Sequence, residues 1–162
     1  HKFILETARF LEKQPYNILF IPMSFLPPDD RRISFEVIGN MKNGHRAGLV
    51  LTPLPAQDCL DLVSALDFSI TMRLHAAIFS TIAGIPFIDI THHSKNKSYL
   101  QTIDLPELSL DYYEISIRVL DDKFAEINNQ YQRIKEKLLL CANNNKTQLY
   151  ETITNAHLLQ GR

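Results

Sequence analysis

An arginine and a histidine stand two residues apart inside an apolar stretch, Arg73 and His75 within 67–90, which reads DFSITMRLHAAIFSTIAGIPFIDI. A guanidinium group binds phosphate and carboxylate groups through two parallel hydrogen bonds. An imidazole group can transfer protons near neutral pH. The two side chains could therefore hold an anionic substrate and move a proton on it. The structural alternative is an ion pair between Arg73 and a carboxylate such as Asp67, with His75 a satisfied residue at a helix start.

The residues around this pair predict a strand, a polar turn, a helix and a second strand. Residues 68–72 form a short apolar run, and 76–83 are helix formers that end at Gly84, a residue type common just past a helix end. Residues 85–90 read as a second buried strand, which implies parallel pairing. Ligands of such sheets bind beyond the carboxyl ends of the strands, where helix N-termini face anions. The arginine and the histidine are expected at that edge.

The rest of the chain up to residue 110 repeats the alternation of strand and helix, which is the pattern of a doubly wound α/β sheet. The further predicted elements are a helix over 4–13, a strand over 17–23, a helix from Asp29 and Asp30 to Met41, a strand over 48–52, a helix over 57–66, a loop over 91–97, a helix over 98–103 and a linker or short strand over 105–110. We therefore predict a Rossmann-like α/β domain with a parallel sheet over 1–110.

The pattern becomes long and helical over 111–162, where apolar residues recur every three to five positions. The run Asn143-Asn144-Asn145 is predicted to interrupt this helical extension before a last helix. We expect the C-terminal helices to pack on the α/β domain or on a missing N-terminal domain. Tyr112 and Tyr113, at the start of the extension, have two interpretations: packing in the core, or stacking on a sugar.

Polar residues also follow the predicted strand over 17–23, at the same edge of the sheet. They are Ser24, Asp29 and Asp30, all candidates for substrate binding. Two adjacent carboxylates could orient an acceptor hydroxyl or act as a general base. The structural alternative is a helix cap, because aspartate at a helix start accepts hydrogen bonds from free backbone N–H groups.

A third set follows the strand over 85–90 and contains His92, His93 and Lys95. Adjacent histidines do not share a face of a helix or strand, so they make a poor chelating pair, and no metal site is predicted. Lys95 suits a point charge on a phosphate or an acidic sugar. We consider His92 a further candidate for substrate binding.

Composition limits the function classes. The chain has 162 residues, 45% of them hydrophobic, and a formal net charge of -1, so it gives no general attraction to nucleic acid or to an anionic membrane. No apolar run approaches the roughly 20 residues of a membrane-spanning helix. Cys59 and Cys141 lack metal-binding spacing and are interpreted as reduced thiols, which fits a cytoplasmic location. The helical start without a preceding strand suggests that the chain begins inside a larger protein.

The central stretch resembles the C-terminal half of polysaccharide pyruvyl transferases. The resemblance covers about 22–105 and rests on the sequence Met72-Arg73-Leu74-His75-Ala76, preceded by Ala65, Asp67 and Ile70 and followed by Phe79, Ala83, Gly84, Ile85 and Pro86. Asp29 and Asp30 are similar to the acidic helix start of that family. Where the family usually has Tyr-Asp-x-Lys, this chain has His92-His93-Ser94-Lys95, so the lysine matches and the preceding pair does not.

Members of that family transfer pyruvate from phosphoenolpyruvate to two hydroxyls of a sugar, as a cyclic ketal, in surface or exopolysaccharide biosynthesis, and they resemble two-domain GT-B glycosyltransferases. The resemblance implies that Arg73 binds the phosphate or carboxylate of the donor, that His75 is a general acid or stabilises the phosphate, and that Lys95 contacts the donor. The partners would be phosphoenolpyruvate and a glycan or lipid-linked sugar, with no metal or redox cofactor. The enzyme would be cytoplasmic, or peripheral to the membrane where glycans are assembled.

Two other functions stay open at this stage. A nucleotide-sugar glycosyltransferase or epimerase of GT-B architecture also places basic residues at these strand ends, and fold likeness alone does not separate it. Such an enzyme needs a ribose pocket, often with a glutamate, and this chain offers only Asp89 within a strand. A non-catalytic binding or assembly domain is the other alternative, favoured by the altered loop and opposed by Arg73 and His75.

Overall fold

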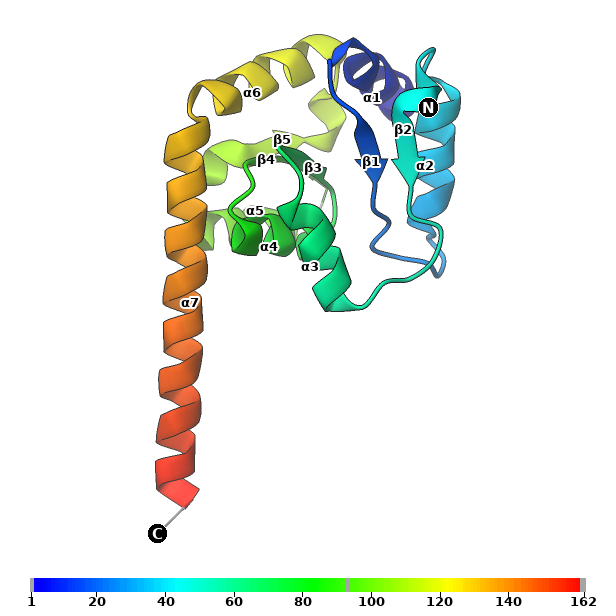
Figure 1. Ribbon diagram of the computed structural model, residues 1–162. Helices are drawn as coiled ribbons and strands as arrows, with labels where there is room; N and C mark the ends of the chain where they lie inside the picture. The colour runs from blue at the N-terminus through cyan, green and yellow to red at the C-terminus, as the bar shows by residue number, and fades with distance from the viewer. Residues whose placement is uncertain (1, 93, 161–162) are drawn as a thin grey trace.

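The computed structural model describes residues 2–92 and 94–160, and only the backbone of 148–160. It is an α/β structure (Figure 1). The strands are β1 (Ile18–Phe20), β2 (Ala47–Leu49), β3 (Ser69–Thr71), β4 (Phe87–Thr91) and β5 (Ser109–Asp111). The helices are α1 (Lys2–Lys13), α2 (Asp30–Gly39), α3 (Ala56–Ser64), α4 (Leu74–Ala83), α5 (Ser94–Thr102), α6 (Ile117–Asn129) and α7 (Tyr131–Gln160), with 3-10 turns η1 (Gly44–Arg46), η2 (Pro106–Leu108) and η3 (Tyr112–Glu114).

Every strand pair is parallel, as predicted, but the strands form two hydrogen-bonded groups. One group is β1-β2 and the other is β3-β4-β5. The α/β class with parallel strands and covering helices is thus confirmed, and a single continuous ladder is absent from the described residues. Figure 1 shows β1 on the side of its group that is nearer the three-stranded group. The chain leaves β1 through α2 toward β2, and it leaves β3 through α4 toward β4, so the helices diverge from the junction of the two groups.

Side chains join the two groups of strands in place of ladder hydrogen bonds. Phe124 on α6 lies edge-on to Phe68, which precedes β3, with 4.9 Å between ring centroids. The same ring contacts Tyr16, which precedes β1, at 6.5 Å, and Phe10 of α1 at 5.9 Å. These aromatic contacts connect the amino ends of β1 and β3. An ion pair, described below, connects their carboxyl ends.

The main hydrophobic core combines β4 with the C-terminal helices. Its fully buried members include Phe87, Ile88 and Ile90 of β4, and the same cluster contains buried side chains of both C-terminal helices, namely Leu120, Ile127, Ile134 and Leu138. The first part of the helical extension therefore packs on the α/β elements, while Figure 1 shows α7 continuing well past them. In the described part of the chain, no helix is both long enough and apolar enough to cross a membrane.

Two predicted boundaries were wrong. The asparagine run 143–145 does not interrupt the last helix, because α7 continues from Tyr131 to Gln160 and the break falls at Gln130. Asparagine is a mild helix breaker whose cost is easily overridden by context, and Thr147 bonds back to the Asn143 carbonyl within the helix. The predicted loop over 91–97 is also too long. Helix α5 begins at Ser94, so Lys95 lies in its first turn.

Gly84 ends α4 in the left-handed conformation, with φ of 68°, as its position in the sequence predicted. A Cβ atom there would lie 2.6 Å from Leu139 of α7. We expect Gly84→Ala to lower the free energy of unfolding by about 2 kcal/mol, through backbone strain and crowding. Urea unfolding measures the change. Gly39→Ala is the matched control. A Cβ atom at Gly39 would have no atom within 4 Å, so this variant should be neutral or stabilising by about 0.5 kcal/mol. Equal effects of the two variants would contradict the account.

Candidate active site

Arg73 and Asp30 form an ion pair between the carboxyl ends of β1 and β3. Arg73 is the N-cap residue of α4, and Asp30 is the first residue of α2. The Arg73 Nη2 atom donates to Asp30 Oδ1 at 2.6 Å, and Nε donates to both carboxylate oxygens at 3.2 and 3.3 Å. The pair lies at the junction where the crossover helices diverge. Ligands of open α/β sheets bind at such a switch point.

The Arg73 guanidinium keeps one edge open. Asp30 occupies the edge formed by Nε and Nη2, and Nη2 also reaches the Pro28 carbonyl oxygen at 3.4 Å. The Nη1 atom makes no hydrogen bond with any described residue, and the side chain is 42% exposed. A guanidinium offers five N–H donors in a planar fork and can engage a second anion on its other edge. Asp30 therefore orients Arg73 and leaves it able to bind a ligand.

Asp30 also makes hydrogen bonds with the backbone at this edge. Its Oδ2 atom also accepts hydrogen bonds from the backbone N–H groups of Met23 and Ser24, at 3.1 and 3.0 Å. The backbone N–H of Asp30 in turn donates to the Ser24 carbonyl oxygen at 3.0 Å. Its carboxylate is thus engaged on both oxygens, which favours a positioning function over that of a general base. The Ser24 hydroxyl donates to the Leu26 carbonyl oxygen at 3.0 Å.

Asp29 has a different environment from Asp30. It is the N-cap of α2, accepting from the Arg31 backbone N–H at 2.9 Å, and it forms an ion pair with the Arg31 side chain at 2.6 Å. These hydrogen bonds from Arg31 hold the pKa of the Asp29 carboxyl below its ordinary value. The helix-cap interpretation fits Asp29, while Asp30 is the aspartate that contacts Arg73.

Basic side chains lie in the first turns of two helices at this edge. His75 is exposed in the first turn of α4, and Lys95 is exposed in the first turn of α5. Neither side chain makes a hydrogen bond or ion pair with a described residue, and neither first turn contains an acidic residue. Positive side chains near a helix N-terminus cost stability, whereas anions are favoured there. A bound anion would relieve this arrangement, so these residues favour an anion site.

His92 follows β4 and packs against aromatic rings. Its ring centroid lies 5.0 Å from that of Tyr112 and 5.7 Å from that of Tyr113. Within the described ranges, no three side chains of the metal-ligating types come together. His93 lies outside the described residues.

Asp89 is a buried carboxylate that the sequence analysis did not assign to the site. It lies in β4 with no solvent exposure, opposite Thr71 of β3. Thr71 Oγ1 donates to Asp89 Oδ1 at 2.6 Å, and Asn96 Nδ2 of α5 donates to both oxygens at 2.9 and 3.1 Å. The bonds tie the segment before Arg73 to the first turn of α5, beside Lys95. The signal in the sequence was a single charged residue inside an otherwise apolar strand.

The contribution of Asp89 to the free energy of unfolding should depend on pH. Burial raises the pKa of Asp89 above its ordinary value of 3.8. A carboxyl whose pKa is higher in the folded than in the unfolded state contributes its full stabilisation at pH values below the unfolded-state pKa. This stabilisation is lost as pH rises through the folded-state pKa. Asp89→Asn removes this loss, so its stability relative to the wild type should increase with pH over that window. Urea unfolding at a series of pH values measures the difference, and a constant difference would contradict the assignment.

Asp89→Ala provides the companion variant. It leaves the buried Thr71 and Asn96 donors without their acceptor, so the free energy of unfolding should fall by about 3 kcal/mol.

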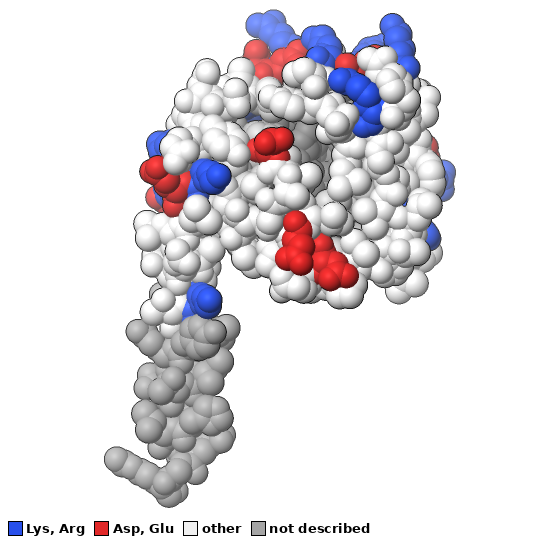
Figure 2. All heavy atoms as spheres, in the orientation of Figure 1, with Lys and Arg blue, Asp and Glu red and all other residues white. Residues whose placement is uncertain are grey.

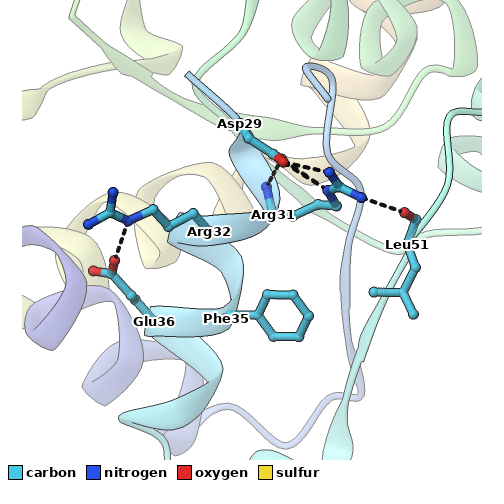
Figure 3. Close-up of a pocket in the computed structure, with 6 residues that line it drawn as sticks. All are labelled: Asp29, Arg31, Arg32, Phe35, Glu36 and Leu51. Carbon is cyan, nitrogen blue, oxygen red and sulfur yellow. Dashed lines mark hydrogen bonds and ion pairs between the residues drawn. The ribbon is translucent and has the colours of Figure 1, made fainter. Parts of the chain in front are cut away.

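Two shallow hollows flank this edge, and neither suits an anion. One, of about 460 Å³, is lined by Phe35 and Leu51 and by two ion pairs, Asp29–Arg31 and Arg32–Glu36, whose charges balance (Figure 3). The other, of about 410 Å³, lies on α3 and includes Asp58 and Asp61. Acidic side chains gather over α3 in Figure 2, which also shows a hollow between the two groups of strands.

Comparison with known proteins gives the family. A family model described as polysaccharide pyruvyl transferase matches residues 1–94. The chain belongs to the polysaccharide pyruvyl transferase family. The match covers Ser24, Asp29, Asp30, Arg73 and His75 together with β1 to β4, and it ends one residue before Lys95. No solved structure matches the chain.

Membership indicates a transferase of polysaccharide biosynthesis, with a sugar acceptor. In this member of the family, the structure brings Arg73 and Asp30 into direct contact across 43 positions of sequence. It places His75 two residues beyond Arg73 on the same helix start, and Lys95 on the helix start that follows β4. The candidate residues thus come from the carboxyl ends of β1, β3 and β4, as parallel strands require.

Proposed function

We propose that this chain takes part in transferring pyruvate from phosphoenolpyruvate to two hydroxyls of a sugar, forming a cyclic ketal. The observation that carries the proposal is Arg73. It is oriented by Asp30 at the start of α4 with its Nη1 edge open, two residues before the exposed His75. This arrangement suits a small, doubly anionic donor.

Phosphoenolpyruvate carries a phosphate and a carboxylate. The open edge of Arg73 and the free N–H groups at the start of α4 would hold one of these groups, since helix N-termini and guanidinium groups both favour anions. Lys95, in the first turn of α5, supplies a second positive charge for the other group or for the leaving phosphate.

The reaction needs proton transfer and the loss of phosphate. A proton is added to the methylene carbon of the donor, which becomes a methyl group, and a sugar hydroxyl attacks the enol carbon. The C–O bond to phosphate breaks, and a second hydroxyl of the same sugar closes the ketal. One hydroxyl proton balances the proton added to carbon and the other leaves with the phosphate. No redox change occurs, so the reaction requires no redox cofactor, and the proposal includes no metal.

We assign His75 as the group that delivers the proton to the methylene carbon. An imidazole can donate a proton near neutral pH, and the exposed position of His75 beside the proposed donor site leaves its ring accessible. The proposed acceptor is a glycan or lipid-linked sugar at the membrane surface where glycans are assembled. A facing domain of the GT-B type would close the site.

Asp89 is fully buried and bonded to Thr71 and Asn96, so it cannot reach a ribose. The carboxylate that the sequence offered for a ribose pocket is therefore not available to a nucleotide-sugar donor. The open edge of Arg73 favours a ligand-binding function over a purely structural one.

Isotope transfer tests the proposal. Phosphoenolpyruvate labelled at its enol carbon is incubated with the protein and a mixture of cell-surface glycans, and the products are followed by NMR. We expect the label to appear as a ketal carbon attached to two sugar oxygens, together with one equivalent of phosphate. Label released only as free pyruvate, or consumption of a nucleotide sugar in its place, would contradict the proposal.

A further inference from the structure

Three aromatic rings form a cluster beyond the carboxyl ends of β4 and β5. The ladder between these strands ends at the pair Thr91 and Asp111, and His92 and Tyr112 are the first residues after the two strands. The Tyr112 and Tyr113 rings lie edge to face at 5.4 Å, and the His92 ring lies against both. We call His92, Tyr112 and Tyr113 the aromatic platform. It stands at the same edge of the sheet as Arg73 and His75.

The platform leaves a large ring in solvent. Tyr113 is 75% exposed, so the core-packing interpretation does not hold for it. Burying an aromatic side chain stabilises a fold, and tyrosine is enriched at binding interfaces because it combines an apolar ring with a polar hydroxyl. The tyrosine hydroxyls of the platform make no hydrogen bond with any described residue. Both the ring face and these hydroxyls are therefore available to a ligand.

The surrounding contacts hold the platform in place without a ligand. The Tyr113 backbone N–H donates to Asp111 Oδ1 at 3.0 Å, and Lys97 Nζ donates to Asp111 Oδ2 at 3.2 Å. Both hydrogen bonds lower the pKa of the Asp111 carboxyl, and the bond from Tyr113 has the larger effect. On its other side, Tyr112 stacks on Phe3 of α1 at 5.2 Å. A surface that is already ordered loses little conformational entropy on binding.

We propose that the aromatic platform binds a sugar ring of the acceptor, with Tyr113 stacked on the ring. A pyranose presents a flat C–H face surrounded by hydroxyls, which matches an aromatic face beside free tyrosine hydroxyls. The ion pair beside the platform, Lys97–Asp111, is neutral overall, so the platform suits an uncharged ligand, in contrast to the cationic helix starts at Arg73 and Lys95. The identification of this sugar as the acceptor rests on the proposed function, whereas sugar binding by itself does not.

Saturation-transfer NMR on the full chain tests the platform, with the methyl glycosides of glucose, galactose and mannose as probes. We expect transfer to the C–H protons of at least one glycoside and a loss of affinity of about tenfold in Tyr113→Ala. Tyr113→Phe keeps the ring and should retain most of the affinity. Phe35→Ala is the matched control, since it removes another exposed aromatic ring, 56% exposed, from the hollow shown in Figure 3.

The outcomes separate the two proposals. No transfer to any glycoside, or transfer lost in Phe35→Ala and kept in Tyr113→Ala, overturns the platform. Transfer that disappears when uridine diphosphate is added and is replaced by binding of the nucleotide to Tyr113 overturns it as well. Glycoside binding that needs Tyr113 supports it, even where phosphoenolpyruvate fails to bind, a result that would defeat only the proposed function. Phosphoenolpyruvate affinity should be equal in wild type and Tyr113→Ala.

Discussion

Arg73→Ala is expected to weaken phosphoenolpyruvate binding about a hundredfold, because a charged partner of a bound anion is removed. The fold should survive, since the pair with Asp30 is partly exposed, at 42% and 20% of the two side chains. Partly exposed ion pairs contribute about 0–1 kcal/mol, and Asp30 keeps its hydrogen bonds from Met23 and Ser24. Calorimetric titration and urea unfolding on the same samples measure the two effects.

Two further variants make the Arg73 test specific. Arg73→Lys keeps the charge but loses the planar fork that binds Asp30 through two hydrogen bonds on one edge and leaves the other for the ligand, so we expect an intermediate loss of about tenfold. Arg118→Ala removes an arginine whose side chain is 89% exposed on α6 and should leave the affinity unchanged. An Arg73→Ala protein that unfolds, or one that binds the donor normally, would show that the residue is structural.

His75→Ala should reduce turnover at saturating donor by about a hundredfold to ten-thousandfold, the range for removing a general acid. The affinity for phosphoenolpyruvate should stay within a few-fold of the wild type, because Arg73 and the start of α4 still bind the anion. Phosphate release in the presence of acceptor measures turnover, and calorimetry measures binding.

His75→Gln separates the two functions that a histidine can have here. Glutamine can donate a hydrogen bond to phosphate but cannot act as an acid near neutral pH. If His75 delivers the proton, His75→Gln should be as inactive as His75→Ala. If its turnover recovers toward that of the wild type, His75 stabilises the phosphate instead and the proton has another source.

The sequence predicted the elements of the α/β fold because its signals are local. Apolar runs of strand length alternate with helix formers, and Gly84 marks a helix end that the structure confirms. The same signals place Arg73 and His75 at the start of α4. Local patterns could not reveal that β1 and β3 are joined by side chains and not by ladder hydrogen bonds, since such pairing depends on residues far apart in sequence.

The partners of charged residues were the least predictable part of the site. Asp67 was the carboxylate first considered as the ion-pair partner of Arg73, but the structure pairs Arg73 with Asp30. Between Asp30 and Arg73 the chain passes through β2 and α3. Asp89 was considered only in place of a ribose-binding glutamate, whereas its hydrogen-bond donors come from β3 and α5. Tyr112 and Tyr113 have similar sequence surroundings, but only the three-dimensional structure separates the half-buried ring from the exposed one.

Two cations at this edge work against helix stability. Arg73 at the start of α4 and Lys95 at the start of α5 are placed where helix dipoles disfavour cations. Sites that bind ligands commonly break such local rules. Occupation of the site should therefore raise the stability of the chain, in proportion to donor affinity and concentration.

The open edge of Arg73 is proposed to receive phosphoenolpyruvate. Calorimetric titration of the full chain with phosphoenolpyruvate, and in parallel with uridine and cytidine diphosphates, measures this binding. We expect phosphoenolpyruvate to bind, the heat to disappear in Arg73→Ala, and both nucleotides to bind more weakly. Tighter binding of either nucleotide, or binding of phosphoenolpyruvate that survives in Arg73→Ala, would contradict it.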